Sequence, residues 1–66
     1  MKIQESIDGF RVDIYCKGDI YYDFYLDSKN YKILMEWLES DYNHIEIGNK
    51  YVLILDDVIR IHLRGG

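Results

Sequence analysis

Proline is absent from the 66-residue chain, and cysteine occurs once, at Cys16. A single cysteine cannot form an intramolecular disulfide, so packing and hydrogen bonds must hold the fold, as in proteins of the reducing cytoplasm. A hydrophobic fraction of 48% excludes an intrinsically disordered chain. The longest apolar run, residues 51–55, is far too short to span a bilayer, and residues 1–7 lack a signal-peptide core. We therefore predict one small cytoplasmic domain over residues 1–66, without membrane contact.

Positive charge is also scarce, because the net charge is −4 at neutral pH. Nonspecific binding to DNA or RNA depends on neutralising phosphates with lysine and arginine, and the sequence shows no concentrated basic patch. We therefore do not expect direct nucleic-acid binding. An acidic balance favours a basic protein partner or imitation of nucleic acid.

Motifs for catalysis, metal binding and cofactor binding are lacking. Cys16 lies on the apolar face of its predicted strand, where a thiol is usually inert packing. His44 and His62 have no metal-ligand spacing to another histidine or cysteine. The glycines fall in predicted turns and at the C-terminus, not in a phosphate-binding loop. We predict a non-enzymatic protein without catalytic residues, metal or cofactor.

Ser28–Tyr42 is the only segment with helical periodicity. Asp27 or Ser28 can cap its first turn, and Asn43 is expected to end it. The predicted buried stripe consists of Tyr31, Leu34, Met35, Leu38 and Tyr42.

Alternating apolar and polar residues predict strands on both sides of this helix. The expected strands are Met1–Ile7, Phe10–Lys17, Ile20–Asp27, Ile45–Ile47, Lys50–Leu55 and Val58–Leu63. The nearly continuous apolar run of Lys50–Leu55 suits a central strand covered on both faces. Short turns predict antiparallel hairpins at Asp8-Gly9, Gly18-Asp19, Gly48-Asn49 and Asp56-Asp57, although one parallel pair in the middle stays open. The order predicts an α+β fold, a two-layer sandwich with a single helix between two groups of two or three strands in a mostly antiparallel sheet.

Two groups of residues are candidate partner-binding surfaces. Tyr15, Tyr21 and Tyr25 face away from the predicted helix, and tyrosine is enriched in interface cores. Ile33 and Trp37 are four residues apart and point away from the apolar stripe. Unless a loop covers them, they form an exposed pair of the kind that marks an interface. A homodimer is one outcome that these surfaces leave open.

The N-terminal segment Ile3-Gln4-Glu5-Ser6-Ile7 resembles the segment around the Glu-Ser-Ile motif of phage-encoded uracil-DNA glycosylase inhibitors. Those are small acidic proteins that imitate DNA, and their motif enters the DNA-binding cleft of the enzyme. The resemblance implies that Glu5, Ser6 and Ile7 enter such a cleft. It also implies an acidic surface around them, formed by Asp8, Asp13, Asp23 and Asp27.

The C-terminal residues Leu63-Arg64-Gly65-Gly66 resemble the tails of ubiquitin-like modifiers and of bacterial sulfur carriers. Those are β-grasp proteins whose last strand lies parallel to the first in the middle of the sheet. The resemblance implies that Gly65 and Gly66 enter an activating enzyme, which converts the terminal carboxylate to an acyl-adenylate.

Three functional classes follow from the sequence. The first is a small acidic protein-binding module, such as a phage or mobile-element inhibitor of a host nucleic-acid enzyme. The second is a carrier that acts through its Gly-Gly tail, and the third is a homo-oligomeric structural protein.

Overall fold

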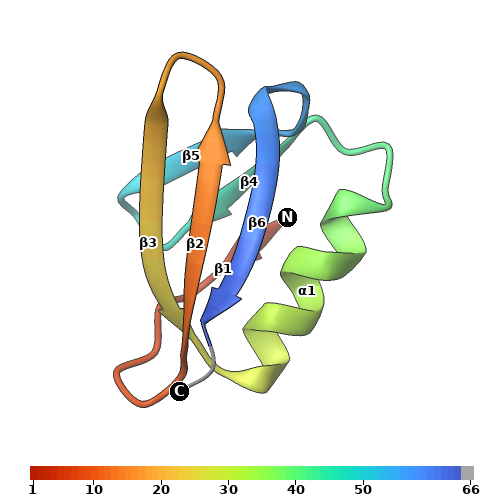
Figure 1. Ribbon diagram of the computed structural model, residues 1–66. Helices are drawn as coiled ribbons and strands as arrows, with labels where there is room; N and C mark the ends of the chain where they lie inside the picture. The colour runs from red at the N-terminus through yellow and green to blue at the C-terminus, as the bar shows by residue number, and fades with distance from the viewer. Residues whose placement is uncertain (65–66) are drawn as a thin grey trace.

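One helix separates two groups of three strands in the computed structural model, which describes residues 1–64 (Figure 1). The predicted α+β class and element order are confirmed. The elements are β1 (Lys2–Ile3), β2 (Phe10–Cys16), β3 (Ile20–Leu26), α1 (Ser28–Leu38), β4 (His44–Ile47), β5 (Tyr51–Ile54), a 3-10 helix (Leu55–Asp57) and β6 (Val58–Arg64).

The strands form two three-stranded sheets rather than one. The first sheet has the order β3-β2-β6 and is antiparallel throughout, with Ile14 of β2 opposite Tyr22 of β3 and Ile61 of β6. The second has the order β1-β4-β5, in which β1 and β4 are parallel. Figure 1 shows the second sheet crossing behind the first, with α1 running along the side of β6. The hairpins predicted at Gly18-Asp19 and Gly48-Asn49 are present.

The hairpin predicted at Asp8-Gly9 is wrong. Only Lys2–Ile3 of the expected first strand is extended in a sheet, and it pairs with β4 instead of β2. Gly9 has no positive φ. Glycine is needed here because the chain passes very close to the end of β3. A Cβ atom on Gly9 would lie 2.1 Å from the backbone oxygen of Leu26. The segment from β1 to β2 therefore crosses the end of β3 with no room for a side chain.

The predicted central position of Lys50–Leu55 is also wrong. The strand β5 is an edge strand in which Leu53 alone is buried, while Val52 is 52% exposed. The centre of this sheet belongs to β4, because β1 occupies its other side. Asp56-Asp57 makes no hairpin either, since the 3-10 helix carries the chain from the second sheet to the first.

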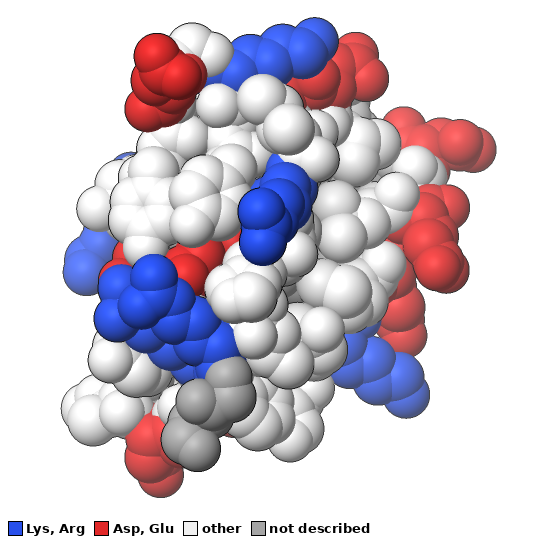
Figure 2. Space-filling view, in the orientation of Figure 1, with Lys and Arg blue, Asp and Glu red and all other residues white. Residues whose placement is uncertain are grey.

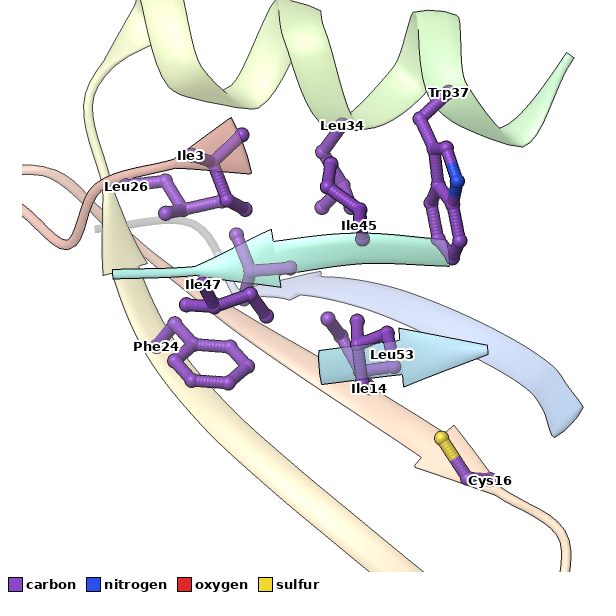
Figure 3. Packing of buried hydrophobic residues seen from close by; sticks show 11 residues of the cluster. Ile3, Ile14, Cys16, Phe24, Leu26, Leu34, Trp37, Ile45, Ile47 and Leu53 are labelled. Atoms are coloured by element: carbon purple, nitrogen blue, oxygen red, sulfur yellow. The ribbon is translucent and has the colours of Figure 1, made fainter. Parts of the chain in front are cut away.

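The core lies where α1 meets both sheets, and Figure 3 shows Leu34 and Trp37 pointing from α1 toward the strands. Trp37 is the largest fully buried side chain of the protein, at 0% exposure. The buried residues are Ile3, Val12, Ile14, Cys16, Phe24, Leu26, Leu34, Trp37, Ile45, Ile47 and Leu53. This core draws on every strand except β6, whose Val58 and Ile61 pack against it half-buried.

The helix begins as predicted but ends early. Asp27 caps it by accepting a 2.8 Å hydrogen bond from the backbone N–H of Asn30. It ends at Leu38, where the Ser40 hydroxyl donates to the Trp37 carbonyl at 2.7 Å. Tyr42 therefore lies beyond the helix, 62% exposed, and does not belong to the buried stripe.

Candidate functional site

The Glu5-Ser6-Ile7 segment lies in the connection between β1 and β2. The Ser6 backbone N–H donates a 2.7 Å hydrogen bond to the carbonyl of Tyr25, and Gly9 packs against the end of β3. Glu5 forms a 3.1 Å ion pair with Lys50 of the loop before β5. The segment is therefore tied to β3 through its backbone, and an exposed ion pair links it to the loop before β5.

Ile7 is completely exposed at the tip of this anchored segment, with a relative exposure of 101%. A shallow hollow of about 240 Å³ lies beside it, lined by Glu5, Ser6, Ile7 and Tyr25. We call these four residues the motif surface. The fold thus brings together four residues that the sequence assigned to partner binding from two separate observations.

The predicted acidic surface is wrong at Asp13, which is 0% exposed on the outer face of the first sheet. The Tyr21 hydroxyl donates to its Oδ1 at 2.8 Å, and Arg64 Nε lies 2.6 Å from its Oδ2. Arg11 Nε lies 3.5 Å from Oδ1. Burial raises the pKa of Asp13, but the Tyr21 hydrogen bond and the charges of Arg64 and Arg11 outweigh burial, so the net pKa is lowered. Asp13 is a charged structural centre of this face.

The other predicted acids are also engaged. Asp23 accepts a 3.0 Å hydrogen bond from Arg11 Nε and forms an ion pair with Arg11 Nη2 at 2.8 Å. Asp27 is the helix cap, and the hydrogen bonds from Asn30 lower its pKa. Asp8 is exposed and accepts a 3.1 Å hydrogen bond from Ser6. Among these four carboxylates only Asp8 and Asp23 are exposed, and Arg11 balances the charge of Asp23.

The sequence missed a concentration of arginine on the outer face of β3-β2-β6. Pairing with β2 places Arg60, His62 and Arg64 opposite Tyr15, Asp13 and Arg11. Arg60 stacks over the Tyr15 ring at 5.7 Å, and the Tyr15 and Tyr21 rings are 5.1 Å apart. Figure 2 shows basic side chains over this face and most acidic ones around its rim. The alternation within β6 hinted at a basic row, but its position beside β2 follows only from the tertiary pairing.

The prediction that Ile33 and Trp37 form an exposed pair is wrong. Trp37 is fully buried and Ile33 half-buried, because α1 buries a broader arc than the stripe centred on Leu34 and Leu38. Among residues 1–64, the Trp37 indole N–H has no hydrogen-bond partner. Trp37 is therefore a core residue and not a partner contact.

A second hollow lies between α1 and β6, with a volume of about 500 Å³. We call it the α1–β6 groove. Its lining residues are Tyr31, Met35, Leu38, Leu55, Val58, Ile59, Arg60, Ile61 and Leu63. Ile59 and Leu63 are 66% and 42% exposed, so the groove presents open apolar surface.

Other predicted sites have few structural correlates. Gly65 and Gly66 lie outside the described residues. The last strand, β6, pairs antiparallel with β2 at a sheet edge, whereas the carrier resemblance implies a parallel strand in mid-sheet.

Cys16 is buried, and burial together with the Asp57 charge raises its pKa. Residues 1–64 contain no group of three or more metal-ligating side chains, and the helix among them is too short to cross a membrane.

No protein-family model, curated protein or solved structure matches this chain. The two resemblances therefore rest on their short motifs and on the geometry around them.

Proposed function

We propose that this protein is a non-enzymatic module that binds another protein through the motif surface. The observation that carries the proposal is the full exposure of Ile7 on an anchored segment. Burying such a side chain in a partner stabilises a complex by about 1.5–3 kcal/mol. Because the segment is already held by Tyr25 and Lys50, little conformational freedom is lost on binding.

The class of partner that we propose is an enzyme that acts on nucleic acid. The resemblance of residues 3–7 to glycosylase inhibitors and the net charge of −4 support this class. Asp8 adds an exposed carboxylate next to Ile7. The basic DNA-binding cleft of such an enzyme would attract this end of the molecule.

A uracil-excision assay tests the proposal directly. Uracil-DNA glycosylase is mixed with a molar excess of the protein, and release of uracil from a labelled oligonucleotide is measured. We expect inhibition that excess DNA relieves and that Ile7→Asp removes. Ile20→Asp, at an exposed isoleucine outside both the motif surface and the α1–β6 groove, should inhibit like the unaltered protein. Full glycosylase activity in the presence of excess protein would remove the glycosylase version of the proposal.

The carrier hypothesis stays a prediction with its own measurement. Deletion of Gly66 should abolish adenylation by an activating enzyme, observed by mass spectrometry of the intact protein. An unchanged product after deletion would contradict it.

A further inference from the structure

We propose that the α1–β6 groove binds an extended segment of a partner protein, which adds to β6 as a new strand and alternates apolar with acidic residues. Three features of the described residues lead to this inference. They are an open strand edge, an apolar groove beside that edge, and a row of basic side chains on the opposite face. The site shares no residue with the motif surface, so the inference goes beyond the proposed function and does not depend on it.

The strand β6 is at the end of its sheet, in the order β3-β2-β6. On an edge strand, every second residue directs its backbone N–H and C=O groups away from the neighbouring strand. Sheet edges are commonly protected by proline, by bulges, by charged side chains or by a covering helix, and here the α1–β6 groove leaves a gap between α1 and β6. Here proline is absent, and the irregularity between Tyr15 and Cys16 leaves Arg60–Arg64 in regular register. These five residues offer a template for strand addition.

The groove lies on the inner side of this edge. Tyr31, Met35 and Leu38 supply its helix wall, each half-buried, and Ile61 and Leu63 supply its strand wall. Side chains of an added strand would alternate between the two faces of the sheet. Those that point inward would enter the groove, and its apolar walls require them to be apolar.

The remaining side chains of the added strand would lie on the outer face of the β3-β2-β6 sheet, beside the outward residues of β6. The outward residues of β6 are Arg60, His62 and Arg64, none of which is acidic. Asp13 already neutralises Arg64, but within residues 1–64 Arg60 forms no ion pair and only stacks on Tyr15. Opposite charges favour cross-strand neighbours, so the outward residues of the partner strand should be acidic.

A second copy of the chain is a poorer occupant. Antiparallel pairing of two β6 strands around Ile61 would place Arg60 of one copy against His62 of the other. It would also join two basic rows without a carboxylate between them, apart from those already held by Arg11 and Arg64. Charge complementarity therefore favours a segment of a different protein.

Titration with blocked heptapeptides tests the inference on the whole protein. The probe is Glu-Val-Glu-Ile-Glu-Val-Glu, and the matched control replaces each glutamate with lysine. In ¹H–¹⁵N spectra, we expect the acidic probe to shift amides of β6 and α1 and to bind at least about tenfold more tightly than the control. Arg60→Glu should reverse that preference and Leu63→Asp should abolish binding. Ile20→Asp, at an exposed residue outside both the groove and the motif surface, should leave binding unchanged.

A probe methylated on its backbone nitrogens separates strand addition from simple charge attraction. It keeps the side chains but cannot donate to β6, so it should not bind. Because this arm uses the unaltered protein, it decides the question even if Leu63→Asp fails to fold. Equal binding of the acidic and basic peptides, or no shifts at millimolar peptide, would overturn the inference. Shifts of β6 amides that depend on protein concentration alone would assign the edge to a second copy and overturn it as well.

Discussion

Asp13 shows how much one residue depends on its surroundings. Its position on a polar strand face predicts an exposed carboxylate, yet Tyr21, Arg11 and Arg64 cover it completely. Arg64 comes from the end of the described chain and Arg11 from the same strand as Asp13. One carboxylate therefore ties the last strand of the sheet to its centre. A buried charge is tolerable only with such partners.

We predict that Asp13→Asn lowers the midpoint of thermal unfolding at neutral pH by about 5–10 °C. The net pKa of Asp13 is lowered below its usual 3.8 in the folded protein. Its contribution is therefore complete well above pH 3.8 and is lost as the pH falls through the folded pKa. The gap between the variant and the unaltered protein should thus close in strong acid, as followed by circular dichroism. Asp19→Asn is the control, because Asn tolerates the positive φ of 59° there. A gap that persists unchanged in acid would contradict the prediction.

Trp37 is the largest of the fully buried side chains in the core. We predict that Trp37→Ala removes about 3–5 kcal/mol from the free energy of unfolding, through lost burial and the cavity left behind. A core of this size supplies only about that much, so the variant should be largely unfolded. Trp37→Phe should stay folded with reduced stability. Tyr42→Ala, at an exposed residue past the helix, should change stability by less than about 0.5 kcal/mol. Urea titration followed by circular dichroism compares the three variants.

At the scale of elements, the connection between β1 and β2 depends on a close approach and not on a turn type. Gly9 lies against the backbone of Leu26 and Asp27 at the end of β3, and that contact sets the path of the motif surface. The dipeptide Asp8-Gly9 by itself predicts a hairpin turn, which the structure does not have. The close packing of Gly9 against the end of β3 depends on the tertiary structure.

We predict that Gly9→Ala destabilises the protein by about 1–3 kcal/mol, because a methyl group 2.1 Å from the Leu26 oxygen forces the backbone to shift. The same shift should stretch the Ser6–Tyr25 hydrogen bond and weaken any binding through Ile7. Hydrogen exchange of the Ser6 amide reports the stretching of this hydrogen bond, and the exchange should accelerate. Lys17→Ala, at an exposed residue away from this segment, should leave that amide protected. Equal exchange in the two variants would show that the contact does not hold the segment.

At the scale of the whole molecule, two small sheets and one helix share a single cluster of buried residues. Neither sheet has a core of its own, since α1 and strands of both sheets contribute to it. We predict one cooperative transition, in which Trp37 fluorescence and far-ultraviolet circular dichroism report the same midpoint. Separate midpoints would show that one sheet unfolds independently.

The homodimer hypothesis also belongs to this scale, and the burial of Trp37 removes that residue from any dimer interface. A dimer would use an exposed apolar edge, either β5 with Val52 or β6 with Ile59, and charge favours β5 because two paired β6 strands would join their basic rows. Light scattering at micromolar concentration should give twice the monomer mass if the chain dimerises. Ile59→Asp and Val52→Asp then distinguish the two edges. A monomer mass at that concentration would contradict the hypothesis.

The sequence by itself determined the class of the fold, the order of its elements and the positions of two hairpins. These follow from local periodicity, from the glycines at residues 18 and 48, and from the capping carboxylate of Asp27. Only the tertiary structure decided which strands pair, and therefore that β1 joins β4, that Arg60 lies beside Tyr15 and Arg64 beside Asp13, and that Trp37 is buried. The physical reason is that alternation fixes which way a side chain points from its strand, but not what covers it. Covering depends on partners far apart in the chain, and a sequence of short amphipathic strands permits many such pairings.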